Sequence, residues 1–462
     1  MNDNGIKDIQ NRRMRVFREL VELLWNNEGK FSLEVLGDRM VKEGIFREHE
    51  KNIFKSYLRI SMGLDPKSVM EEFSDELDAA MNLERVSKPI VTVLEDVCDI
   101  CRREGKVKEC NVKCEHGASA HIEKRGIIIN NDKCLTCGDC IPDCPLDAVV
   151  DKIEFVPVIK HLKNQKVPVY AAIAPAYIGQ FGEGVKPGQI RSALKHMGFM
   201  DLVEVALFAD LLTLREVYEF DHIVKKHGDY LITSCCCPIW MSMVQKGYPE
   251  LLEHFSPAVS PMIAAGRALK SIYKDCIVVF IGPCIAKKNE AKDKELAGAI
   301  DYVLTFKELD EVFKALKIRL QDQEDDHKEQ SSCGGRIYAR TGGVSRSVES
   351  ALESAGFKDV DFRPIQANGV KECKAVLDKL KLGAVEENFI EGMGCAGGCV
   401  GGPRSILDIE KAVDLVNEYG DSAKYRNALD NARVAIVLEK LNISSIKDVL
   451  GEQAAELLGR EV

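Results

Sequence analysis

The stretch DYLITSCCCPIW, residues 229–240, sets three adjacent cysteines between a short apolar run and a proline. The run DYLITS has the length and composition of a buried β-strand. Similar runs recur after residue 166, in VPVYAAIAP, CIVVFIGP, IDYVLTF and NFIEGMG, and stretches with helical periodicity such as PMIAAGRALKSIY separate them. Strands that alternate with helices predict an α/β domain with mostly parallel sheets flanked by helices.

Cysteines follow three of these predicted strands. The run DYLITS precedes the triplet, CIVVFIG precedes one cysteine and NFIEGMG precedes two, which are in chain order Cys235, Cys236, Cys237, Cys284, Cys395 and Cys399. Ligands of parallel α/β sheets bind beyond the carboxyl ends of the strands. We therefore expect the three loops to bring their thiols to one crevice, where soft thiolates would bind a metal centre.

The composition excludes several classes of function. The 462 residues carry 63 basic and 73 acidic side chains, and the net charge of -10 offers no basic surface for nucleic acid. No apolar run approaches the roughly 20 residues of a membrane span, and the N-terminus lacks the apolar core of a signal peptide. A cytoplasmic location is therefore expected. Because the cytosol keeps thiols reduced, the 17 cysteines favour metal ligation over disulfides.

A second group of cysteines precedes the α/β region. CLTCGDCIPDCP, residues 134–145, has the bacterial ferredoxin spacing, in which three thiolates bind one 4Fe-4S cluster and the fourth binds its neighbour. The preceding half, residues 98–114, has eight residues between its second and third cysteines where ferredoxins usually have two. The usual exchange of fourth ligands gives two sets, Cys98, Cys101, Cys110 and Cys144 for one cluster and Cys114, Cys134, Cys137 and Cys140 for the other. Zinc is the alternative for the preceding half, because a Cys-x2-Cys pair also suits zinc.

These patterns predict three domains. Residues 1–90 hold no cysteine and read as a helical domain for packing or partner docking, in which RRMRVFRELVELLWNN repeats apolar residues at helical spacing. Residues 91–160 form a small α+β, ferredoxin-like domain with two clusters. Residues 161–462 form the α/β catalytic domain, whose C-terminal end returns to helical repeats that pack around its outside.

Three loops resemble the signature loops of the iron-only, or FeFe, hydrogenases. They are TSCCCPIW (233–240), GPCIAKKNE (282–290) and EGMGCAGGCVGGP (391–403), and the resemblance extends over roughly residues 98–404. The first loop is similar to that of the family branch that reads TSCCCP. The resemblance implies reversible interconversion of dihydrogen with protons and electrons at an H-cluster, a 4Fe-4S cube joined to a two-iron unit that carries carbonyl, cyanide and an amine dithiolate.

The resemblance also implies the cofactors and partners. Two accessory 4Fe-4S clusters would relay electrons from ferredoxin or a similar low-potential carrier, and maturation enzymes would build the two-iron unit. By motif position, the cube is held by Cys237, Cys284, Cys395 and Cys399, the last of which also bridges to the two-iron unit. The residues expected to contact the remainder of the cofactor are Lys287, which donates to a cyanide, Met393, Ala174 and Pro175.

The resemblance further assigns a proton path. Cys236 takes the position of the thiol that passes protons to the bridging amine, and the catalytic residues lie, from outside inward, in the order Glu219, Ser256, Glu216 and Cys236. Two glutamates three residues apart share one helix face, which is usually a solvated face when no other signal is present. Cys235 stands where the common form has serine, and we expect a buried spectator or a local tuning group there.

Two positions depart from the common family pattern. Gly282 stands where a methionine is usual, and Met262 stands where a glutamine is usual. Both changes would alter the surroundings of the cluster, which tune its potential. Two other functions stay open at this point. One is a sensor of dihydrogen or redox state that uses the same cofactor, and the other is an iron-sulfur assembly factor that lacks the two-iron unit, against which Cys236, Lys287 and Met393 argue.

Overall fold

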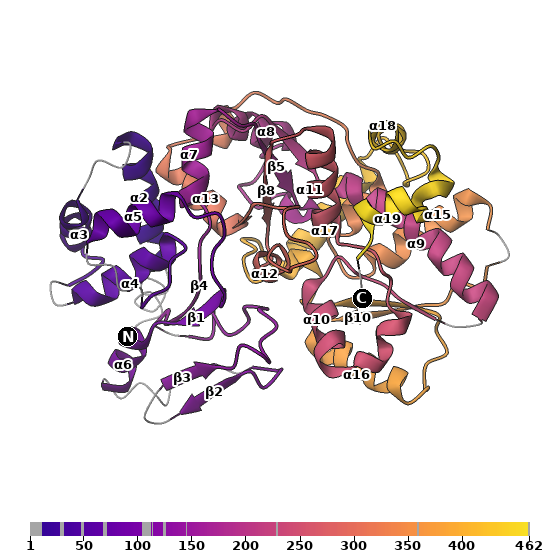
Figure 1. Cartoon of the computed structure of the whole chain (residues 1–462), viewed down its shortest axis with the longest axis horizontal. Coiled ribbons are helices and arrows are strands. Elements are labelled where there is room, and N and C mark those ends of the chain that lie inside the picture. The colour runs from indigo at the N-terminus through magenta and orange to yellow at the C-terminus, as the bar shows by residue number, and fades with distance from the viewer. Residues whose placement is uncertain are drawn as a thin grey trace. The chain divides into compact units, whose positions relative to one another are not determined.

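The computed structural model describes residues 12–27, 32–47, 50–67, 72–103, 112, 114–122, 126–144, 146–227, 230–357 and 360–460. The chain divides into two compact units (Figure 1). The first comprises residues 1–166 and 307–319, and the second comprises residues 167–306 and 320–462. The predicted domain boundaries at residues 90 and 160 stay a prediction.

Helices form the N-terminal part of the first unit, as predicted. They are α2 (Arg12–Asn27), α3 (Leu33–Lys42), α4 (Lys51–Ser61) and α5 (Phe73–Met81). The apolar stripe of α2 is buried, because Val16, Leu20 and Leu24 recur at helical spacing and face the core. Further along the chain this unit contains α7 (Val156–Asn164) and most of α13 (Phe306–Ala315).

Short strands carry the cysteine-rich part of the first unit. Strand β1 (Val91–Val93) pairs antiparallel with β4 (Val149–Asp151), and β2 (Ser119–Ile122) pairs antiparallel with β3 (Gly126–Ile129). Helix α6 (Glu95–Arg103) follows β1 directly. The guanidinium of Arg13 in α2 lies 3.0 Å from the Asp151 carboxylate at the end of β4, and both side chains are buried. This ion pair joins the helical segment to the strands beside the cysteines.

Two parallel sheets form the second unit, so the predicted α/β class is confirmed. The larger sheet has the order β6-β5-β8-β9, from β5 (Val169–Ile173), β6 (Asp201–Glu204), β8 (Ile277–Gly282) and β9 (Tyr302–Thr305). The smaller sheet has the order β10-β11-β7, from β7 (Leu231–Ile232), β10 (Pro364–Asn368) and β11 (Phe389–Met393). All pairs in both sheets are parallel.

Helices pack around these sheets, and β5 and β8 lie side by side among them (Figure 1). They are α8 (Pro187–His196), α9 (Ala206–His227), α10 (Pro238–Gly247), α11 (Pro261–Ile272), α12 (Ala286–Glu290), α14 (Cys333–Ile337), α15 (Gly343–Ala355), α16 (Val370–Lys381), α17 (Ile409–Asp421), α18 (Ala432–Lys440) and α19 (Glu452–Leu458). The last three correspond to the predicted C-terminal helical repeats. Within the described part of the chain, no helix combines the length and the apolar character needed to cross a bilayer.

Candidate active site

The three cysteine loops lie at the carboxyl ends of β7, β8 and β11. Cys237 is the N-cap residue of α10, just after β7, and Cys284 lies two residues beyond β8. Cys395 and Cys399 follow β11, whose last residue is Met393. Strands β7 and β11 are parallel neighbours in one sheet, so their carboxyl ends lie at the same edge.

The thiols of these loops lie close to one another. The backbone N–H of Gly394 donates to Cys237 Sγ at 3.3 Å, which joins the first loop to the third. Burial and the neighbouring Cys237 and Cys399 thiols raise the pKa of Cys284 to about 12. Burial and Cys237 likewise raise the pKa of Cys399 to about 11. Cys395 is half-buried on the same loop as Cys399.

The donor set suits an iron-sulfur cube, because it consists of four cysteine thiols from three loops and such clusters are held by four thiolates. The third loop also passes close to the second. A Cβ on Gly402 would lie 3.0 Å from Pro283, so a larger residue there would push the two loops slightly apart.

Lys287 lies in α12, three residues beyond Cys284, and forms a buried ion pair. Its ammonium donates to Glu290 Oε2 at 2.7 Å. Burial by itself lowers the pKa of Lys287, but Glu290 and the thiols of Cys284 and Cys236 raise it above its usual value. The ammonium is therefore charged at neutral pH, as a donor to an anionic ligand must be. Glu290 was missed by sequence reasoning, because a Lys and a Glu three residues apart usually share a solvated helix face.

We expect Lys287→Met to destabilise the cluster-free chain by about 3 kcal/mol or more, because it leaves the buried Glu290 carboxylate without a cation. The free energy of unfolding, measured in urea, tests this expectation. The double variant Lys287→Met/Glu290→Gln removes both charges and should recover most of the loss. A single variant as stable as the parent chain would contradict the ion pair.

The other predicted cofactor contacts also lie beside the crevice. Met393 is buried at the end of β11. Ala174 follows β5, and its N–H donates to the carbonyl of Ile281 in β8. Pro175 then begins a short 3-10 helix. At the departure Gly282, an added Cβ would lie 2.7 Å from the Phe280 ring and 3.2 Å from Ala174, so these side chains already fill the space beside Gly282.

The structure also gathers one of the two predicted accessory sets. Cys114, Cys134, Cys137 and Cys140 line one small cavity in the first unit. Burial, together with Cys134 and Cys114, raises the pKa of Cys140 to about 12. The four cysteines are those that the exchanged ferredoxin pattern groups together.

The remaining accessory set is described only in part, because Cys110 lies outside the described residues. Cys98 and Cys101 are on α6, and Cys144 precedes β4. The pairing of Val93 with Val149 brings these two segments together, and both Cys98 and Cys144 are buried. The zinc alternative, which groups Cys98 and Cys101 with Cys110 and Cys114, likewise stays a prediction, because it also includes Cys110.

Two contacts mark the predicted proton path at its outer end. Ser256 donates to Glu219 Oε2 at 2.6 Å, and Arg215 donates to Glu219 Oε1 at 2.6 Å. Ser256 is fully buried, and Glu219 is 7% exposed. The two oxygens of the Glu219 carboxyl group thus bond one guanidinium and one hydroxyl.

The inner carboxyl has neutral neighbours. Thr233 donates to Glu216 Oε1 at 2.5 Å, and the thiol of Cys235 lies 3.9 Å from the same oxygen. Burial raises the pKa of Glu216 to about 8, although Thr233 and Tyr338 act in the opposite direction. The other oxygen, Oε2, makes no standard hydrogen bond within the described structure. Glu216 can therefore take up and release a proton near neutral pH.

Cys236 is buried among the cluster cysteines. Burial, Cys235, Cys399 and Cys237 raise the pKa of its thiol well above the usual value, and Lys287 partly opposes them. The thiol is therefore neutral and carries a proton. Cys235 is buried and its thiol lies beside Glu216, so the expected role as a spectator or a local tuning group stays a prediction. Sequence reasoning missed Thr233 and Tyr338, whose roles depend on tertiary contacts.

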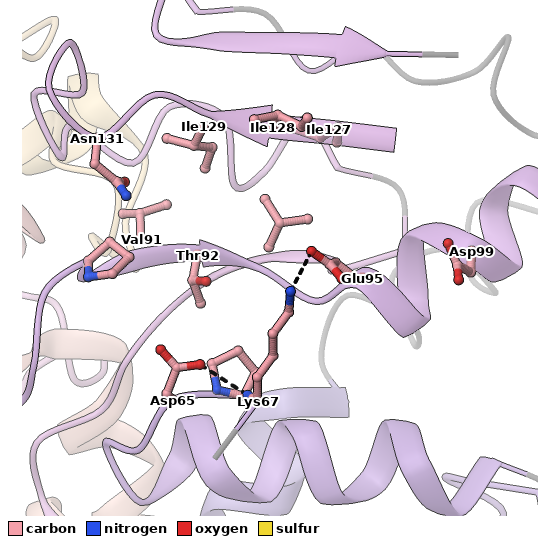
Figure 2. Close-up of a pocket in the computed structure, with 13 residues that line it drawn as sticks. Asp65, Lys67, Val91, Thr92, Glu95, Asp99, Ile127, Ile128, Ile129 and Asn131 are labelled. Carbon is pink, nitrogen blue, oxygen red and sulfur yellow. Dashed lines mark hydrogen bonds and ion pairs between the residues drawn. The ribbon is translucent and has the colours of Figure 1, made fainter. Parts of the chain in front are cut away.

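A separate pocket lies in the first unit and does not involve the cysteine crevice. It has a volume of about 630 Å³ and lies among β1, β3, the start of α6 and the segment that holds Asp65 and Lys67 (Figure 2). Lys67 donates to Glu95 at 2.8 Å on one side of it. None of the lining residues is a predicted site residue.

A family model described as "Iron only hydrogenase large subunit, C-terminal domain" matches residues 167–403. The chain belongs to the iron-only hydrogenase family. The match covers β5 through the third cysteine loop, so all three loops and the proton-path residues fall inside it. The predicted family is thereby confirmed, while the assignment to the TSCCCP branch stays a prediction.

Two curated iron-only hydrogenase relatives illustrate the similarity. The chain is 29% identical over 412 residues to iron hydrogenase 1 of Clostridium pasteurianum, which covers 77% of this chain and 70% of that protein. It is 31% identical over 325 residues to the NADP-reducing hydrogenase subunit HndD of Solidesulfovibrio fructosivorans, covering 58% of this chain and 55% of that protein. The chain thus spans only about half the length of the second relative.

A solved structure supports the fold. A variant of the FeFe hydrogenase HydA1 from Chlamydomonas reinhardtii matches with a TM-score of 0.55 and 20% identity, over 66% of this chain and 97% of that chain. Membership of the iron-only hydrogenase family places the chain among oxidoreductases of the hydrogenase class. The predicted enzyme class is thus confirmed.

Proposed function

We propose that this chain catalyses the reversible interconversion of dihydrogen with two protons and two electrons. The observation that supports the proposal best is the crevice itself. The thiols of Cys237, Cys284 and Cys399 influence one another there, and the neutral thiol of Cys236 and the charged ammonium of Lys287 lie beside them. When bound, the H-cluster supplies the iron at which dihydrogen is cleaved or formed.

The chain's own residues hold the cofactor and exclude water. Cys237, Cys284, Cys395 and Cys399 bind the cube, and Lys287 donates to a cyanide of the two-iron unit from a position fixed by Glu290. Met393, Ala174 and Pro175 pack against the cofactor. These side chains lie at or just beyond the carboxyl ends of strands, and a site supported by such elements is positioned well.

Protons and electrons take separate routes in this proposal. A proton moves between solvent and the crevice through Glu219, Ser256, Glu216 and Cys236. Electrons arrive through two accessory 4Fe-4S clusters, one of which is held by Cys114, Cys134, Cys137 and Cys140. Such clusters commonly have low potentials, which suits ferredoxin or a similar carrier as the partner. Maturation enzymes supply the two-iron unit.

The proposal is tested by anaerobic hydrogen evolution from reduced viologen. The full chain is first purified with only its iron-sulfur clusters and is then loaded with a synthetic two-iron unit. Evolution that begins only after loading supports the proposal. If loading succeeds, as seen by carbonyl and cyanide infrared bands, and no evolution or uptake of dihydrogen follows, the enzyme assignment is wrong. Binding of dihydrogen without turnover would then favour the sensor.

A further inference from the structure

Glu216 is surrounded by neutral hydrogen-bonding groups from separate segments. Thr233 follows β7, Cys235 belongs to the triplet, and Tyr338 immediately follows α14. Arg215 precedes Glu216 in α9, but its guanidinium bonds Glu219 instead. A buried carboxyl with neutral neighbours is stable only if each of its protonation states finds partners.

The hydroxyls of Thr213 and Tyr338 bond each other beside Glu216. Thr213 Oγ1 lies 2.9 Å from the carbonyl of Ala209 and 2.8 Å from the Tyr338 hydroxyl. Tyr338 in turn acts as a donor that lowers the pKa of Glu216. Each hydroxyl has one proton, so it can donate in only one direction at a time.

Counting those protons gives two arrangements of these hydrogen bonds. When Glu216 is ionised, Tyr338 donates to the carboxylate and Thr213 donates to Tyr338. When Glu216 is protonated, Thr213 donates to the Ala209 carbonyl, Tyr338 donates to Thr213, and the Tyr338 oxygen is free to accept from Glu216. Neither arrangement leaves a hydroxyl proton without an acceptor.

The thiol of Cys235 also has two alternative hydrogen-bond acceptors, one of which is Glu216. Its thiol lies 3.2 Å from the carbonyl of Val259 and 3.9 Å from Glu216 Oε1. The S–H can donate to the carboxylate when Glu216 is ionised. It can turn to the Val259 carbonyl when Glu216 is protonated, which leaves sulfur as a weak acceptor. The thiol keeps its own proton throughout.

We propose that Tyr338 and Cys235 are positioning residues that hold Glu216 in both of its protonation states by reversing their hydrogen bonds as the proton on Glu216 arrives and leaves. This inference rests on the proposed function, in which Glu216 is the inner carboxyl of the proton path. It assigns a role to the extra cysteine of the TSCCCP loop. Only the proton on Glu216 is exchanged, so no electron or further reactant is required.

Charged groups around Glu216 set the background for its titration. Glu219 and Glu391 raise its pKa, whereas Thr233 and Tyr338 lower it. Lys287 and Arg460 act on the neighbouring Cys235, and Arg460 also donates to the Cys235 carbonyl. A variant that leaves these charges in place therefore changes the pKa of Glu216 only through its hydrogen bonds.

Infrared difference spectroscopy during a pH titration tests the inference on the full chain carrying only its iron-sulfur clusters. The C=O band of protonated Glu216 is assigned by its loss in Glu216→Gln, and the S–H band by its loss in Cys235→Ala. We expect the C=O band to disappear with a midpoint near pH 8, as the raised pKa requires. The S–H band should shift at the same midpoint and should not shift in Glu216→Gln.

Tyr338→Phe should raise the midpoint by about one unit, because a bond to the charged form is stronger than one to the neutral form. The C=O band itself should also move, because the protonated carboxyl loses an acceptor. Tyr177→Phe is the matched control, since the Tyr177 hydroxyl bonds Glu204 in a different buried network. It should leave both bands and the midpoint unchanged.

An unchanged midpoint and C=O frequency in a folded Tyr338→Phe chain would overturn the role of Tyr338. An S–H band whose frequency does not change as Glu216 titrates would overturn the role of Cys235. This second measurement needs no tyrosine variant. A wrong hydrogenase assignment would give a different result. Hydrogen turnover would be missing after loading while the two bands still titrate together.

Discussion

Cys284→Ala is expected to lower the iron content by one cluster and to abolish hydrogen turnover. Cys284 lies just beyond the carboxyl end of β8, and its thiol is close to those of Cys237 and Cys399. The cube is held by four thiolates from three loops. The variant removes the thiolate of the second loop, and that loop has no other cysteine to replace it. Iron analysis and viologen-driven evolution after loading measure the two effects.

The same strand provides a matched control. Cys276 precedes β8 at its amino end and is also buried, so Cys276→Ala removes a thiol of similar exposure far along the same strand. This variant should keep the full iron content and most of the activity, with at most a modest loss of stability. If both variants behaved alike, the ligand assignment at the strand ends would be wrong.

Much of the fold could be predicted because its central strands are apolar. The runs that predict β5, β8, β9 and β11 are buried along most of their length, and they produce a signal that needs no tertiary information. Strands β6 and β10 were missed. Each lies at the edge of its sheet and includes polar residues, such as Asp201 in β6 and Gln366 in β10, which interrupt the apolar pattern.

From spacing and from the place after apolar runs, the candidate site could be predicted only as far as its cysteines. The family resemblance added the lysine, the other cofactor contacts and the proton-path residues. Thr233, Tyr338 and Glu290 have no such signal, because their partners are brought to them by packing. Tyr338 illustrates the limit, since its hydroxyl reaches Thr213, which lies 125 positions away in the sequence.

Cys236→Ala is expected to lower turnover by about 10²- to 10⁴-fold in both directions, which is the usual contribution of a positioned proton donor. Alanine cannot carry a proton, and Cys236 is the buried thiol of the triplet whose surroundings include both Cys399 and Lys287. The iron content and the infrared bands of the loaded two-iron unit should stay as in the parent chain, because the thiol binds no iron. Evolution and uptake of dihydrogen after loading measure the loss.

A variant of the neighbouring Cys235 distinguishes a residue that carries the proton from one that only positions the carrier. Cys235→Ala should reduce turnover far less than Cys236→Ala, because Cys235 faces Glu216 and the Val259 carbonyl rather than the cluster cysteines. Cys373→Ala, a change at a buried thiol that donates to the Met393 carbonyl, controls for lost volume near the crevice. A loss in Cys235→Ala equal to that in Cys236→Ala would mean that the proton passes through both thiols. A Cys236→Ala chain with unimpaired turnover would place the proton route elsewhere.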